Sequence, residues 1–109
     1  MTFKELQKNH SVWAAKNFPF AATWEPLVGA MEELGELSHA HLKCHQGIRT
    51  NEDHKAKKAD AVGDIILYLA HYCSMAGIDM QTAVEMVWSE VSKRDWIANP
   101  ENGKTDEWR

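Results

Sequence analysis

Apolar residues recur every three or four positions in four separate stretches of the chain, which is the spacing of an amphipathic helix. The first stretch begins with Thr2 three residues before Glu5, the spacing of a capping box, and predicts a helix from about residue 3 to residue 16. The second follows Thr23, a predicted N-cap, and is expected to stop near Gly47. Its apolar positions share one side of the helix: Leu27, Ala30, Met31, Leu34, Leu37 and Leu42.

The second half of the chain predicts two further helices. A loop is expected from Gly47 to about Asn51, after which a third helix enters through lysines and continues to Gly77, with a middle that is apolar on almost every side. Asp79 is the predicted N-cap of a fourth helix, which should stop before Asn99-Pro100 because the residue before a proline disfavours helical backbone. The apolar positions of this fourth helix are Ala83, Val84, Val87, Trp88 and Val91.

These four helices define the expected fold. No stretch alternates β-branched and polar residues, so no strand is predicted. The predicted fold is all-α, and four helices with short connections are most simply packed as an antiparallel four-helix bundle. The length of 109 residues fits a single domain, with a core over about residues 3–98 and a loose polar tail over residues 99–109. Because the third helix is so apolar, we expect the chain to assemble as a homodimer or homotetramer.

Carboxylates cluster on the second and third helices. Glu32, Glu33 and Glu36 lie on one side of the second helix, because residues three and four apart are neighbours on a helix surface. Asp60 and Asp64 stand one turn apart on the third helix, in its most apolar part. A glutamate run taken alone is more typical of a solvated helix face, but a second acidic pair in so apolar a helix favours a shared site.

No permanent positive charge lies near these acids in sequence. Lysine and arginine are absent from Asn17 to Leu42 and again from Ala59 to Ser92. Partly buried carboxylates are costly unless they are paired, so a divalent cation between the two helices is expected. Open clusters of oxygen ligands suit Mg²⁺, which shares its shell with substrate phosphates, and Mn²⁺ is a possible substitute.

At this point the motifs resemble a known family. The sequence Glu32-Glu33-Leu34-Gly35-Glu36, followed after a loop by Asp60 to Leu69, resembles the MazG-like all-α nucleoside triphosphate pyrophosphohydrolases. Further likeness covers most of residues 10–100, namely Trp13 to Pro19, Trp24 to Leu27 and Lys93 to Trp96. The resemblance implies Mg²⁺-dependent hydrolysis of an NTP or dNTP to the monophosphate and pyrophosphate by a homo-oligomer. Ala61 stands where the family motif usually has glutamate, which leaves Asp64 and the preceding Asp60.

Roles for the acids follow from the chemistry of phosphoanhydrides, which needs charge neutralisation and a positioned water. We expect Glu33, Glu36, Asp60 and Asp64 to hold the metal. Glu32 is expected to join them or, together with Glu33, to act in catalysis by orienting the attacking water as a general base.

Basic and aromatic residues complete the expected site. Lys93 and Arg94 are the first basic residues after the long gap, and positive charges suit the negative end of a helix. Both are also candidates to bind the substrate, and the resemblance favours a catalytic phosphate contact for Lys93. Trp13, Phe18 and Trp96 are candidates to stack on a nucleobase, although aromatic residues at helical spacing are more often core. A cluster of lysines ranks below Lys93 as a phosphate contact: Lys55, Lys57 and Lys58.

Three other interpretations stay open. His41, Cys44, His45, His71 and Cys73 have spacings compatible with zinc, but they lack paired C-x-x-C motifs. A second interpretation is a non-catalytic helical interaction module whose acids bind metal for stability or bind a basic partner. The third is a related pyrophosphohydrolase that acts on a phosphoribosyl nucleotide.

Charge and composition limit the classes of partner and the location that we expect for this protein. A net charge of -4 gives no reason to expect a nucleic-acid duplex or an anionic membrane as partner. The N-terminal segment lacks a signal-peptide core and the longest apolar run, Ile65 to Ala70, is too short to span a bilayer, so a cytoplasmic location is expected. Cys44 and Cys73 are expected to be free, buried thiols.

Overall fold

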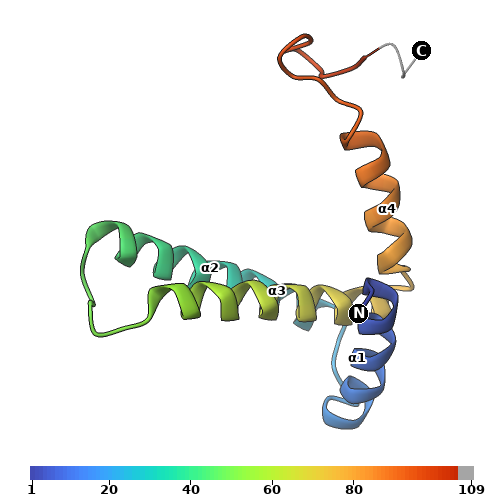
Figure 1. The fold of residues 1–109 in the computed structure, drawn as a ribbon. Helices are drawn as coiled ribbons and strands as arrows, with labels where there is room; N and C mark the ends of the chain where they lie inside the picture. The colour runs from blue at the N-terminus through green and yellow to red at the C-terminus, as the bar shows by residue number, and fades with distance from the viewer. Residues whose placement is uncertain (106–109) are drawn as a thin grey trace.

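The structure is a computed structural model that describes residues 1–105, and these form four helices and no strand (Figure 1). The prediction of an all-α fold is therefore confirmed. The helices are α1 (Phe3–Asn17), α2 (Trp24–Gln46), α3 (His54–Ala76) and α4 (Met80–Val91).

The helix ends lie where capping residues occur in the sequence. The Thr2 hydroxyl accepts a hydrogen bond from the Glu5 amide at 3.1 Å, and the Glu5 carboxylate accepts one from the Thr2 amide at 3.3 Å, so the predicted capping box is confirmed. Asp79 caps α4 as predicted, by accepting from the Thr82 amide at 2.9 Å. Gly47 ends α2 with a left-handed backbone, φ 68°, which glycine adopts without steric cost.

Two end regions differ from the predictions. Thr23 occupies the N-cap position of α2, but its backbone is already helical and its side chain makes no capping hydrogen bond. After Val91 the chain turns back on itself instead of continuing as helix: the Asp95 amide donates to the Gly103 carbonyl at 2.8 Å. The predicted loose tail is thus folded as far as this hydrogen bond reaches, and its residues 106–109 lie outside the described residues.

The helices form an open, L-shaped arrangement. Helices α2 and α3 lie side by side as an antiparallel hairpin, α1 packs on α3, and the start of α4 contacts α1 (Figure 1). Helix α4 then leads away from the hairpin, because its axis is bent by 109° from that of α3. The prediction of an antiparallel four-helix bundle is therefore wrong for a single chain, in which α4 touches α1 at its start and does not lie alongside the hairpin.

The open arrangement leaves a small core. Among residues 1–105, the buried apolar side chains are Ala14, Pro26, Ala40, Ala61, Ala70 and Met80. Small side chains allow α2 and α3 to approach closely, but most of the predicted apolar side of α2 faces solvent. Leu27, Met31, Leu34 and Leu42 are exposed, since α3 is the helix against which α2 packs.

Two smaller predictions concern membranes and thiols. No single helix within residues 1–105 is both long and apolar enough to cross a bilayer; only α3 and α4 taken together, as a bent pair, reach that length and composition. Both cysteines are free as expected, but only Cys73 is half-buried, and Cys44 is exposed because its side of α2 has no covering helix.

Candidate functional site

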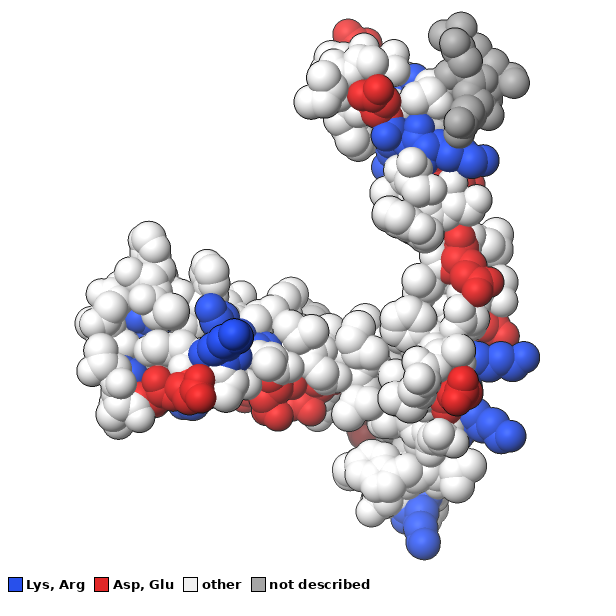
Figure 2. Space-filling view, viewed as in Figure 1, with Lys and Arg blue, Asp and Glu red and all other residues white. Residues whose placement is uncertain are grey.

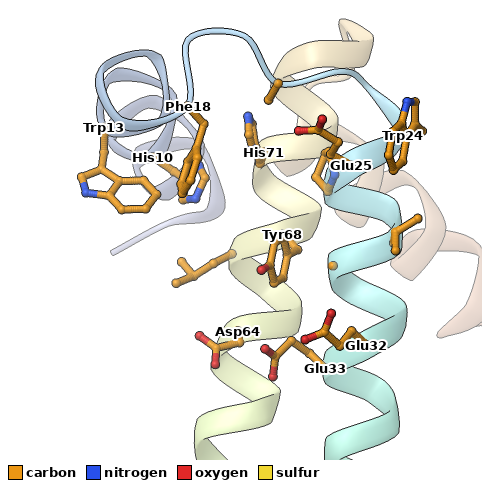
Figure 3. A pocket seen from close by; sticks show the side chains of 15 residues that line it. His10, Trp13, Phe18, Trp24, Glu25, Glu32, Glu33, Asp64, Tyr68 and His71 are labelled. Atoms are coloured by element: carbon orange, nitrogen blue, oxygen red, sulfur yellow. The ribbon is translucent and has the colours of Figure 1, made fainter.

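A pocket of about 580 Å³ lies where α1 approaches the α2–α3 hairpin, and its two ends differ in chemistry (Figure 3). Glu32 and Glu33 from α2 and Asp64 from α3 line one end. Trp13 and Phe18 from the α1 region line the other end. The pocket therefore brings together five residues that the sequence predicts to share one site.

The acidic end holds carboxylates close enough to repel one another. The pKa of Glu33 is raised above its ordinary value, first by desolvation and then by the negative charges of Glu36, Asp64 and Glu32. The Oε2 atom of Glu33 has almost no solvent exposure and no hydrogen-bond partner. The side chain lies between the two packed helices, so an uncompensated carboxylate oxygen sits at the α2–α3 contact.

The predicted metal ligands are only partly assembled. The charges of Glu36 and Asp64 raise the pKa of Glu33, although Glu36 is not among the residues that line the pocket. Asp60 neither lines the pocket nor contributes to the raised pKa of Glu33. In the part of the chain that the structure describes, no three acidic, histidine or cysteine side chains are arranged as a complete metal-binding group. Holding a cation would require these side chains to turn toward a common point.

The aromatic end is built from rings in mutual contact. Trp13 and Phe18 meet edge to face with their centroids 5.5 Å apart. The His10 ring lies 5.4 Å from that of Trp13 and 5.4 Å from that of His71 on α3. Burial, and then the neighbouring His71, lower the pKa of His10, so the neutral imidazole is favoured at neutral pH. This end offers flat, largely uncharged surfaces to a ligand.

Several pocket residues were not assigned to the site from the sequence. Tyr68 lies between the acidic and aromatic ends, one helical turn after Asp64, and this spacing would have identified it. His10 precedes Trp13 by three residues and shares its side of α1 in the same way. The remaining lining residues become neighbours of the site only through packing: Ala21, Trp24, Glu25, Pro26, Val28, Gly29, Leu67 and His71.

The structure does not bring the predicted basic residues to the pocket. Lys93, Arg94 and Trp96 follow α4, which leads away from the hairpin, and none of them lines the pocket. The Arg94 guanidinium instead lies over the Trp96 ring, 5.9 Å from its centroid. The placement of these three residues in one site with the acids is therefore wrong within a single chain.

Charges are also separated along the hairpin. Acidic side chains gather along one edge of it, and the lysines lie toward its closed end (Figure 2). The Lys57 ammonium forms an ion pair there with the Glu52 carboxylate at 3.1 Å. Its charge is therefore paired with a nearby acid and not with the acids of the pocket. Within the described residues the pocket is lined by no lysine or arginine.

The set considered for zinc is dispersed. His41 and His45 line a separate groove on α2 with Leu37 and Leu42, whereas His71 faces the main pocket. Within the described residues, these histidines and cysteines therefore do not form a common zinc site.

Comparisons with models of protein families, with curated proteins and with solved structures give no match for this chain. The resemblance to the MazG-like hydrolases therefore stays a prediction from the motifs.

Proposed function

We propose that the chain is a Mg²⁺-dependent nucleoside triphosphate pyrophosphohydrolase, which converts an NTP or dNTP to the monophosphate and pyrophosphate. One observation carries the proposal: a single pocket joins a carboxylate cluster to a set of aromatic rings. A nucleotide has the matching halves, because its phosphates require a metal ion and its base offers a flat π surface. The volume of about 580 Å³ lies in the range of small-molecule sites.

The residues present fit a divalent cation. Glu33 carries an oxygen without a hydrogen-bond partner beside other carboxylates, and no lysine or arginine within the described residues lines the pocket to neutralise it. Glu33 and Asp64, which line the pocket, would hold the ion together with Glu36, and Asp60 would be a further ligand. Bound Mg²⁺ would offset the phosphate charge and polarise the phosphoanhydride.

The remaining residues have separate roles in this proposal. Glu32 lines the pocket beside Glu33 and is the candidate to orient and deprotonate the attacking water. Trp13 and Phe18 hold the base by stacking, which positions the phosphates at the acidic end. A phosphate contact by Lys93 would require α4 of another copy to reach this pocket.

The experiment is a measurement of pyrophosphate release from a panel of NTPs, dNTPs and phosphoribosyl nucleotides, with Mg²⁺ or with EDTA. We expect release with Mg²⁺ only, and loss of at least about 100-fold in Asp64→Asn and Glu36→Gln with unchanged helical content. Glu101→Gln, an exposed acid outside the pocket, is the control and should keep full activity. If no nucleotide in the panel is hydrolysed by the folded protein, the proposal is wrong.

A non-catalytic role is the second candidate, because a cation bound among the carboxylates around Glu33 would relieve their mutual repulsion without any reaction. In that case Mg²⁺ would raise the melting temperature of the protein while no pyrophosphate is released from any nucleotide.

A further inference from the structure

Two polar side chains of the pocket have no role in the proposed hydrolysis: Glu25 from α2 and His71 from α3. Glu25 lies seven residues before Glu32, and His71 lies seven residues after Asp64, so each stands about 10.5 Å along its helix from an acid of the acidic end. Because α2 and α3 are antiparallel, both displacements run in the same direction. Glu25 and His71 therefore share the aromatic end of the pocket, as Figure 3 shows.

The two side chains offer different hydrogen-bonding chemistry to a ligand. An ionised carboxylate only accepts hydrogen bonds, whereas a neutral imidazole donates one through its N–H group. Glu25 is exposed and His71 is half-buried, and among residues 1–105 neither side chain has a hydrogen-bond or ion-pair partner. The His71 ring instead contacts the His10 ring, with 5.4 Å between the centroids. Both polar groups are thus available beside the aromatic rings.

A nucleobase stacked on Trp13 and Phe18 would turn one edge toward this acceptor and this donor. The edges of cytosine and adenine match them, because an exocyclic amino group donates to a carboxylate and the unprotonated ring nitrogen next to it accepts from an imidazole. Uracil and hypoxanthine carry an oxo group and an N–H group at the same two positions. Their oxo group would oppose the Glu25 carboxylate, which would lose water without gaining a hydrogen bond.

We propose that Glu25 and His71 select the base, so that the pocket prefers cytosine and adenine nucleotides to uracil and hypoxanthine nucleotides. The inference rests on the proposed function, because it assigns the base end of the same pocket. The separation of about 10.5 Å from the acidic end is one that a ribose and its first phosphates span. Within the described residues no lysine or arginine lines the pocket, so the Glu25 carboxylate keeps its full capacity to accept from an amino group.

Nucleoside monophosphates separate base selection from catalysis, because they contain no phosphoanhydride. With Mg²⁺ present, quenching of tryptophan fluorescence should show that cytidine monophosphate binds at least about 10-fold more tightly than uridine monophosphate. Adenosine monophosphate should exceed inosine monophosphate in the same way, since an amino group is again exchanged for an oxo group.

Glu25→Gln should bring both affinity ratios to within about twofold of one, because an amide can donate to an oxo group as well as accept from an amino group. His71→Phe keeps a ring beside His10 but removes the N–H group, and it should also reduce both ratios. Glu25 is exposed, so its substitution should not change the helical content. The matched control is Glu90→Gln, which removes the same charge from an exposed glutamate of α4 outside the pocket and should keep the wild-type ratios.

Equal binding of the cytidine and uridine monophosphates by the wild type would overturn the inference, and so would a preference that survives unchanged in Glu25→Gln or His71→Phe. Failure of the folded protein to bind any of the four monophosphates would overturn it as well. None of these results decides the hydrolysis, which the release of pyrophosphate tests separately. Base-selective binding without pyrophosphate release from any nucleotide would disprove the hydrolysis and retain the base site.

Discussion

The ring of Tyr68 on α3 lies against the backbone of Gly29 on α2, where an added Cβ would come within 2.6 Å of the ring atoms Cδ1 and Cζ. A glycine inside a helix costs about 1 kcal/mol relative to alanine, so the presence of Gly29 within α2 calls for a packing reason. The missing side chain lets Tyr68 stand between the acidic and aromatic ends of the pocket (Figure 3).

Gly29→Ala is therefore expected to lower the free energy of unfolding by about 1–3 kcal/mol, because the Tyr68 ring must move out of its place. Urea denaturation measures this. The matched control is Gly35→Ala on the same helix, where an added Cβ meets nothing within 4 Å, and it should raise stability by up to about 1 kcal/mol. Equal effects of the two substitutions would show that the Gly29–Tyr68 contact is not tight.

Glu33→Gln should change how stability depends on Mg²⁺. Because the pKa of Glu33 is raised in the folded protein, its contribution to stability is present below the ordinary glutamate value of 4.5 and is lost as the pH rises through the higher folded value. At pH 7.5 in EDTA, the amide should therefore raise the melting temperature. Mg²⁺ should stabilise the wild type more than this variant.

Differential scanning fluorimetry with and without Mg²⁺ measures both effects of Glu33→Gln. Glu101→Gln is the control and should respond as the wild type does. An undiminished Mg²⁺ response in Glu33→Gln would remove this residue from the proposed ligands.

His10 should make stability fall in mild acid. Its pKa is lowered below 6.5 in the folded chain by burial and by His71, so the unfolded chain binds the proton more readily. Stability is then complete above pH 6.5 and declines as the pH falls through the lower pKa of the folded protein. His10→Phe should show a smaller decline between pH 7.5 and 5.5 in urea denaturation, while the exposed His39→Gln should decline like the wild type.

Local sequence signals account for the helices and for half of the site. Helix capping depends on neighbouring residues alone, so three helix ends could be predicted: the caps at Thr2 and Asp79 and the left-handed Gly47. The acids of α2 and α3 came together because a short connection makes these helices antiparallel neighbours. His71 could not be assigned, since its contact with His10 depends on how α1 crosses α3.

The direction of α4 was not predictable for a related reason. Helical periodicity predicted which residues of α4 form its apolar face. The angle between α3 and α4, however, depends on hydrogen bonds from Gln7, which lies more than seventy positions away in sequence. Placing Lys93 near the acids assumed a closed bundle within one chain. Spacing along the sequence carries no information about such an angle.

Gln7→Ala tests that control of α4. Losing the hydrogen bonds to Ile78 and Met80 should lower the free energy of unfolding by about 1–3 kcal/mol, at roughly 0.5–1.5 kcal/mol for each bond. Amide hydrogen exchange at Met80 should accelerate. Asn9→Ala, an exposed amide side chain on the same helix, is the control and should leave exchange at Met80 unchanged. If exchange at Met80 is unaltered in Gln7→Ala, contacts other than the Gln7 hydrogen bonds hold the α3–α4 junction.

The three-residue break between α3 and α4 governs the shape of the whole chain. It begins at Gly77, whose φ of 70° is open to glycine and strained for other residues. Were this position and its neighbours to become helical, α3 and α4 would merge into one straight rod of about 57 Å, at 1.5 Å per residue. A single achiral residue thus separates a bent chain from a linear one, and substitutions at Gly77 should change the direction of α4 while leaving the α2–α3 hairpin and its acidic residues in place.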